Sequence, residues 1–126
     1  MNWRDNLPKG HLGFGGPGWW MASCLLLLIA EKPSYGYELA SRLKKFGIIF
    51  PGIGHMGSLY RSLSFLELSG FIIPEWDTSI SPPRKIYKLT PLGRKYLNDI
   101  AQIMKNLKIS VDKFLEIYDN LKKEKI

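Results

Sequence analysis

The stretch GFGGPG at residues 13–18 is the first in the chain whose residue types and spacing could do chemistry. It matches G-x-G-x-x-G, a pattern whose glycines let a backbone loop approach the pyrophosphate of a dinucleotide. An acidic residue usually follows about 20 positions later and binds the ribose, and Glu38 stands twenty residues after Gly18. Taken alone, this motif therefore suggests a nucleotide-binding enzyme.

The surroundings of this stretch argue against that function. A dinucleotide loop needs a strand before its glycines, but only the twelve residues MNWRDNLPKGHL come first, without a strand-like apolar run. Glu38 falls inside a helical pattern instead of ending a second strand, and Pro17 lacks a backbone donor that a phosphate would use. We therefore predict a Gly/Pro-rich arm over residues 1–18, which adds weak phosphate contacts or lies across a dimer.

Other groups that could do chemistry do not form a set. His11 and His55 stand apart, and the one cysteine, Cys24, lies in the apolar run WWMASCLLLLIA, so neither a zinc-ligand spacing nor an internal disulfide is present. No paired carboxylates, Ser/His/Asp set or phosphate-binding Gly-Lys-Ser/Thr motif is recognisable. We therefore expect no enzyme activity, no metal and no cofactor.

The charge balance points to a polyanionic partner. Eighteen Lys and Arg residues oppose eleven Asp and Glu, which gives a net charge of +7. Such a balance favours nucleic acid or an anionic membrane surface. The apolar run over residues 19–30 has twelve residues, whereas a membrane-spanning helix needs about 20. We expect no membrane span and a soluble, cytoplasmic protein.

Five segments must position the basic residues. Apolar spacing of three and four residues indicates helices, whereas β-branched and aromatic runs on both sides of a turn indicate a hairpin. The predicted elements are a helix over 19–31, a helix over 35–46, a helix over 56–69, a hairpin with strands 71–77 and 84–89, and a helix over 91–123.

Local signals set the ends of these elements. We expect Ser34 to cap the second helix and Gly47 to end it, and Thr90 followed by Pro91 to begin the last. Pro74 restricts its strand to an edge position or a bulge. The first helix has almost no polar face, so we expect it to be buried on all sides, which hints at a partner subunit.

The last helix carries an unbroken apolar seam with alternating spacings of three and four. At 1.5 Å per residue this helix is about 50 Å long and outreaches a small domain. We therefore predict that much of the seam meets a second copy of the chain, as in a coiled coil. The predicted dimerisation residues are Leu97, Ile100, Met104, Leu107, Val111, Phe114, Tyr118 and Leu121.

Three helices, a two-stranded hairpin and a long helix together indicate an α+β, mainly helical fold: a winged helix-turn-helix with a long C-terminal dimerisation helix. The domains are then an arm (1–18), a winged-helix DNA-binding domain (19–90) and a dimerisation helix (91–126). The third helix could enter a major groove, and the hairpin tip could reach phosphates. A winged helix that docks a protein or an RNA remains an alternative.

Three motifs resemble the PadR family of transcriptional regulators. They are YGYELASRL, GSLYRSLSFLELSGFI and PRKIYKLTPLGRKYL, in that order over about residues 25–97. Three features depart from the family pattern: Ser58 stands where threonine is usual, Arg61 stands where proline is common, and the arm is additional. The resemblance implies a homodimeric regulator of transcription, for which we expect repression, and a dimer interface that can host a small apolar or aromatic effector.

The residues expected to contact DNA combine the basic pattern with these motifs. They are Ser58, Tyr60, Arg61, Arg84 and Lys85, followed by Arg42, Lys44 and His55. The expected effector-lining residues are Trp19, Trp20, Phe114 and Tyr118, for which filling of the core is the alternative.

Overall fold

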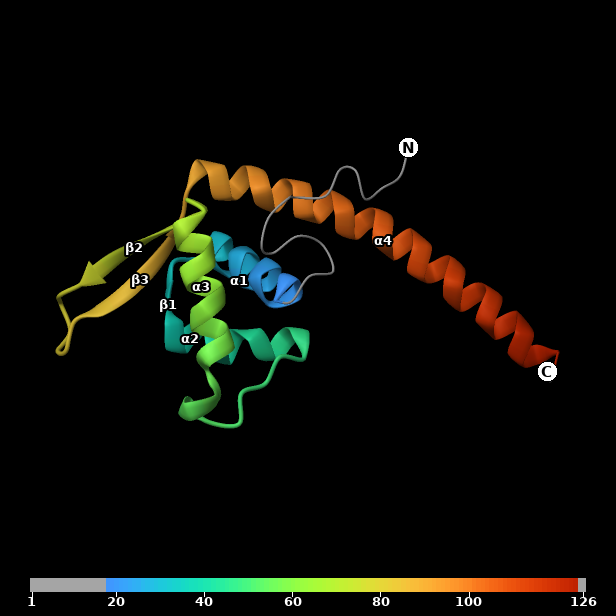
Figure 1. Cartoon of the computed structure of the whole chain (residues 1–126), viewed down its shortest axis with the longest axis horizontal. Helices are drawn as coiled ribbons and strands as arrows, with labels where there is room; N and C mark the ends of the chain where they lie inside the picture. Colours follow the sequence, from blue (N-terminus) through green and yellow to red (C-terminus); the bar gives the residue numbers. More distant parts are fainter. Residues whose placement is uncertain (1–17, 125–126) are drawn as a thin grey trace.

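The computed structural model describes residues 18–124, apart from the side chain of Ile53, and its elements follow the predicted order (Figure 1). The predicted arm lies outside the described residues except for Gly18. The elements are α1 (Trp19–Glu31), β1 (Ser34–Tyr35), α2 (Gly36–Arg42), η2 (Leu43–Phe46), η3 (Ile53–His55), α3 (Gly57–Leu68), β2 (Ile72–Asp77), β3 (Arg84–Leu89) and α4 (Pro91–Lys123).

The fold is the expected winged helix, mainly helical with a small antiparallel sheet. Helix α1 lies in the middle, and α2, α3, β3 and the first half of α4 pack around it (Figure 1). Buried leucines from α1 and α3 form the centre of the core. These residues are Leu25, Leu26, Leu28, Leu59, Leu63 and Leu66.

The sequence suggested that helix α1 is buried on all sides, but within one chain it is not. Trp20 and Leu27 remain about half exposed and form an apolar strip next to α4. The rest of the helix is buried or half-buried except at its C-terminal end. The single domain therefore covers α1 almost completely, and only this strip is left for another molecule.

The sheet has three strands in the order β1–β3–β2. Strand β2 lies at an edge, which is one of the two positions that Pro74 allows. The two-residue strand β1 was not predicted: Ser34 pairs with Tyr87, and Tyr35 pairs with Ile86. This strand joins the hairpin to the start of α2.

Strand β1 also corrects the predicted cap of the second helix. Ser34 lies buried in the strand, where its hydroxyl donates to the carbonyl of Lys32. Helix α2 begins at Gly36, and the carboxylate of Glu38 accepts the backbone N–H of Tyr35 at 2.9 Å. The helix changes to the 3-10 segment η2 at Leu43 and ends at Gly47, whose φ of 76° is left-handed.

The connection between β3 and α4 is built around Thr90, which caps α4 as predicted. Its hydroxyl accepts the backbone N–H of Gly93 at 3.0 Å and donates to the carbonyl of Gly70 at 2.6 Å. Its own N–H donates to the carbonyl of Phe71 at 3.1 Å. Phe71 in turn stacks on Tyr96, with ring centroids 4.2 Å apart. These contacts tie α4 to the end of α3 and to the wing.

Helix α4 divides into two parts. Ile100 is only 2% exposed, and Leu97 and Met104 are partly buried against the same core. Beyond Leu107 every side chain is exposed, and the helix projects away from the rest of the molecule (Figure 1). The first part of the predicted dimerisation seam therefore packs on its own domain, and the second part is free in the single chain.

Candidate nucleic-acid interface

The outer face of α3 presents the residues that the sequence suggested for a major groove. Leucines occupy the inner face, whereas Arg61 and Ser64 are exposed and Ser58 is half-buried near the start of the helix. A helix with one apolar face in the core and one polar face in solvent has the geometry for entering a groove.

Tyr60 is neither a core residue nor a free one. Its side chain is 47% exposed, and its ring lies against Gly36, where an added Cβ would be 2.9 Å from Cε1 of the ring. Gly36 is the first residue of α2, so this contact requires a small residue there. Through Tyr60, helix α3 therefore touches the start of α2.

Two cations near the tip of the wing lie over aromatic rings. The guanidinium carbon of Arg84 is 4.8 Å from the centre of the Tyr37 ring, and Nζ of Lys85 is 5.8 Å from the Trp76 ring. An aromatic face attracts a cation without neutralising its charge. Both side chains thus keep their charge for a phosphate.

A carboxylate near these cations is occupied by other donors. Oδ1 of Asp77 accepts the backbone N–H of Ser79 at 3.0 Å and its hydroxyl at 2.5 Å, and Oδ2 accepts the hydroxyl of Tyr35. These hydrogen bonds, those from Ser79 first, hold the pKa of Asp77 below its usual value. The bond to Asp77 is likewise the main cause that raises the pKa of Tyr35.

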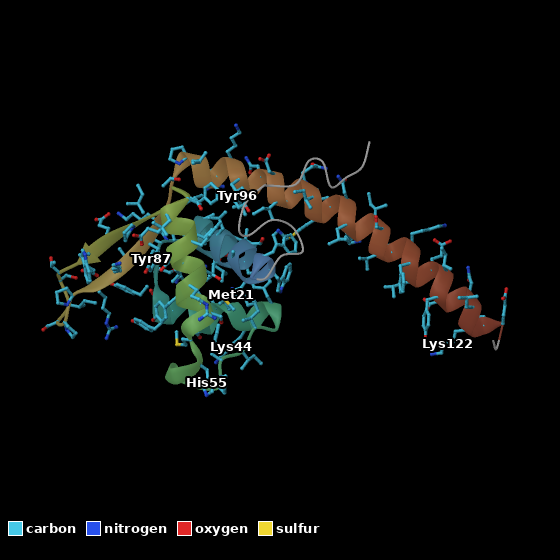
Figure 2. All side chains as sticks on the ribbon, viewed as in Figure 1. Met21, Lys44, His55, Tyr87, Tyr96 and Lys122 are labelled. Atoms are coloured by element: carbon cyan, nitrogen blue, oxygen red, sulfur yellow. The ribbon has the colours of Figure 1, made fainter. Side chains whose placement is uncertain are left out.

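The remaining candidates on α2 and beyond it differ in availability. The side chain of Arg42 is 13% exposed, and its guanidinium donates to Ser34, to the carbonyl of Leu28 and to Glu31 at 2.5–3.0 Å. Its bonds therefore hold the ends of α1 and α2 together. Lys44 on η2 and His55 in η3 are exposed (Figure 2).

Ion pairing leaves a distinct set of cations unpaired. Within residues 18–124 the ion pairs are Arg42–Glu31, Lys88–Glu75, Lys108–Asp112 and Lys113–Glu116. Free basic groups can neutralise phosphates and release their counterions. The candidates without an ion pair in this region are Lys44, Arg61, Arg84 and Lys85.

A small apolar cavity of about 100 Å³ lies between α1, η2 and α4. Of the four suggested effector residues, Trp20 lines this cavity, whereas Trp19 is buried and packs its ring 6.1 Å from that of Trp20. Phe114 and Tyr118 lie on the projecting part of α4, away from the cavity of their own chain.

The sequence did not identify the other walls of the cavity. They are Ser23, Cys24, Leu27, Phe46, Leu97, Ile100, Ala101 and Met104. Burial raises the pKa of the Cys24 thiol to about 11, so the thiol is neutral at physiological pH. The lining is therefore uncharged, which suits an apolar molecule. Phe46 comes from the end of η2, a placement that no local pattern signals.

The projecting part of α4 carries the rest of the predicted dimerisation seam. Phe114 is 70% exposed, and Val111, Tyr118 and Leu121 are about half exposed. Apolar side chains this exposed on a long helix are typical of a protein interface. No helix within residues 18–124 is long and apolar enough to cross a membrane, and no group of three metal-ligating side chains occurs there.

The comparisons with known proteins agree with this geometry. Residues 25–99 match the family described as "Transcriptional regulator PadR-like family". Uncharacterized protein X of Lysinibacillus sphaericus is 29% identical over 119 residues, which cover 90% of this chain and 95% of the relative.

Solved structures extend the likeness to the whole fold. A conserved protein of unknown function, TM0937, called a potential transcriptional factor, is 51% identical with a TM-score of 0.72, over 90% of this chain and 96% of its own. A PadR-like transcription factor from Bacteroides fragilis is 28% identical with a TM-score of 0.64, over 77% and 91% of the two chains.

Proposed function

Because the chain belongs to the PadR-like family of transcriptional regulators, which are DNA-binding regulators and not enzymes, we propose a more specific function for it. The protein binds a particular double-stranded DNA sequence as a homodimer, represses transcription there, and is released by a small apolar or aromatic molecule. Each protomer places α3 in a major groove, with half-sites about one helical turn apart.

One observation carries the DNA-binding part of the proposal: unpaired cations of α3 and of the wing are linked through the start of α2. Tyr60 of α3 lies against Gly36, and the next residue, Tyr37, lies under Arg84 of the wing. Arg61 follows Tyr60 on α3 and has no ion pair within the described region. The groove-entering helix and the wing thus carry free positive charge on elements that touch each other.

The exposed apolar side chains on the second half of α4 support the homodimer. This helix has 33 residues and is about 50 Å long, and its seam beyond Leu107 has no partner in the single chain. A second copy would cover these side chains, and the exposed strip of Trp20 and Leu27 on α1 offers a surface for them.

The cavity beside α4 supports the effector. It is lined by apolar side chains of α1, η2 and α4, so a molecule bound there would touch both the DNA-binding domain and the dimerisation helix. Such a molecule acts as a switch only if it binds the DNA-competent dimer and another dimer with different affinity.

The test of DNA binding compares single alanine variants on one duplex, selected by the purified protein from genomic fragments. Arg61→Ala and Arg84→Ala should each weaken binding and, because each removes one phosphate contact per protomer of the dimer, reduce the magnitude of the slope of log K against log salt by about two. Lys122→Ala is the matched control, because it removes the same charge at the far end of α4 (Figure 2). Unchanged duplex binding in both arginine variants, or salt-dependent binding of RNA in place of duplex DNA, contradicts the proposal.

The dimer is tested by light scattering after size-exclusion chromatography at micromolar concentration. Phe114→Asp should shift the protein toward monomer, because a charge would be desolvated in the apolar seam. Lys105→Asp, on an exposed and polar part of the same helix, should leave the dimer intact. A wild-type monomer at this concentration contradicts the homodimer.

A further inference from the structure

Two opposite charges face each other in the wing without pairing. Asp77 of β2 and Arg84 of β3 are register partners at the outer end of the antiparallel hairpin. Side chains of register partners lie on the same face of a sheet, and opposite charges there attract each other. Yet the four ion pairs within residues 18–124 include neither residue. Something must hold this carboxylate and this guanidinium apart.

The carboxylate is held by donors from two sides. Oδ1 of Asp77 takes both the N–H and the hydroxyl of Ser79, within the tip of the wing. Oδ2 takes the hydroxyl of Tyr35, which reaches it from β1, across β3. Every bond of this carboxylate therefore goes to a neutral donor.

The guanidinium is held on the other side by a tyrosine. Arg84 lies over the ring of Tyr37, and that ring stacks on Tyr35 with centroids 5.7 Å apart and an interplanar angle of 8°. Tyr35 thus has two functions: its ring supports the ring beneath Arg84, and its hydroxyl occupies the carboxylate that would otherwise neutralise Arg84.

We propose that Tyr35 is a positioning residue for DNA binding, whose hydroxyl keeps Asp77 away from Arg84 so that Arg84 remains free for a phosphate of the duplex. The inference rests on the DNA-binding function proposed above. Tyr35 does not touch DNA itself, and it acts through the charge that it leaves unpaired.

Tyr35→Phe tests this directly. It removes one oxygen and retains both the ring that stacks on Tyr37 and the backbone N–H that donates to Glu38. With Oδ2 free, Asp77 pairs with Arg84, and one phosphate contact is lost in each protomer of the proposed dimer. The magnitude of the slope of log K against log salt should then fall by about 1.8. Between about 50 and about 200 mM salt, the affinity of the variant should drop about 12-fold less than that of the wild type.

A second substitution separates positioning from a structural effect. Asp77→Asn makes the side chain neutral, so Tyr35→Phe in that background should regain the wild-type salt slope. In an Arg84→Ala background, Tyr35→Phe should change neither the slope nor the affinity, since the contact is already absent. Tyr96→Phe is the matched control, because it also removes one tyrosine hydroxyl, but from helix α4 and not from the wing (Figure 2).

The outcomes distinguish the two claims. If the wild type shows no salt-dependent duplex binding, the proposed function fails and the inference fails with it. If the wild type binds and Arg84→Ala weakens binding, the function stands. The inference is then overturned by a Tyr35→Phe variant with wild-type slope, or by one whose loss persists with Asp77→Asn.

Discussion

Gly93 leaves no room for a side chain, which leads to a prediction about the junction of wing and α4. An added Cβ would lie 2.1 Å from the backbone oxygen of Phe71 and 2.8 Å from Cδ1 of Leu89. A carbon and a carbonyl oxygen normally approach to about 3.3 Å. Gly93→Ala therefore forces the start of α4 away from Phe71 by about 1 Å.

The cost follows from what this movement breaks. Overpacking against a backbone atom costs about 1–3 kcal/mol, and opening the turn weakens the cap that Thr90 makes with Gly93, worth about 1 kcal/mol. Alanine in a helix returns about 1 kcal/mol relative to glycine. We expect a net destabilisation of about 1–3 kcal/mol, which corresponds to a fall in Tm of about 4–12 °C.

Urea and thermal unfolding followed by circular dichroism measure this loss at a fixed protein concentration, since a dimer's stability depends on concentration. Gly57→Ala is the matched control: Gly57 also lies in a helix, but its added Cβ would meet only the mobile end of Arg61 at 3.3 Å. That variant should keep or slightly raise the Tm. A Gly93→Ala protein as stable as the wild type would refute the account of the junction.

Three further predictions concern the fold. Arg42→Met should cost about 2 kcal/mol in urea unfolding, because it leaves the Ser34 hydroxyl and the Leu28 carbonyl without their charged donor; a loss below about 0.5 kcal/mol contradicts this. Thr90→Ala should lower the free energy of unfolding by about 1 kcal/mol in the same assay, and an unchanged urea midpoint would contradict a stabilising cap at Thr90. Cys24, 3% exposed, should react with iodoacetamide at pH 8 at least about 100-fold more slowly in the folded than in the unfolded chain. Since folding raises its pKa from 9.0 to about 11, stability should fall as the pH rises through that window, and equal alkylation rates would disprove its burial.

Elements whose ends depend on neighbouring residues were predictable from sequence. Helix α1 and helix α4 have the expected bounds, and β3 and the edge position of β2 also agree. Thr90 with Pro91 and the glycine at position 47 act within a few residues, so their effect can be recognised without knowing the fold. The same holds for the alternating spacing of α4.

Features that depend on distant parts of the chain were not predictable. Strand β1 has two residues and exists because β3, about 50 positions later, pairs with it. The bonds of Arg42 depend on how the ends of α1 and α2 meet, so the sequence suggested a DNA contact where the structure has an internal network. The heptad pattern likewise could not show that Ile100 belongs to the core of its own domain.

The candidate interface follows the same division. The sequence placed Arg61, Arg84 and Lys85 on the right elements, but it did not reveal the aromatic rings beneath the last two. Nor did it reveal that Tyr35 engages Asp77, since the two are 42 residues apart. The contacts of these residues with DNA remain predictions.

The affinity of the purified wild-type protein for a selected duplex, measured as a function of salt, tests the central claim most directly. Four cations without an ion pair in the described region, Lys44, Arg61, Arg84 and Lys85, would make eight phosphate contacts in the proposed dimer. At about 0.9 per contact, the slope of log K against log salt should approach about −7. A slope near zero, or no binding to any duplex, would contradict the account.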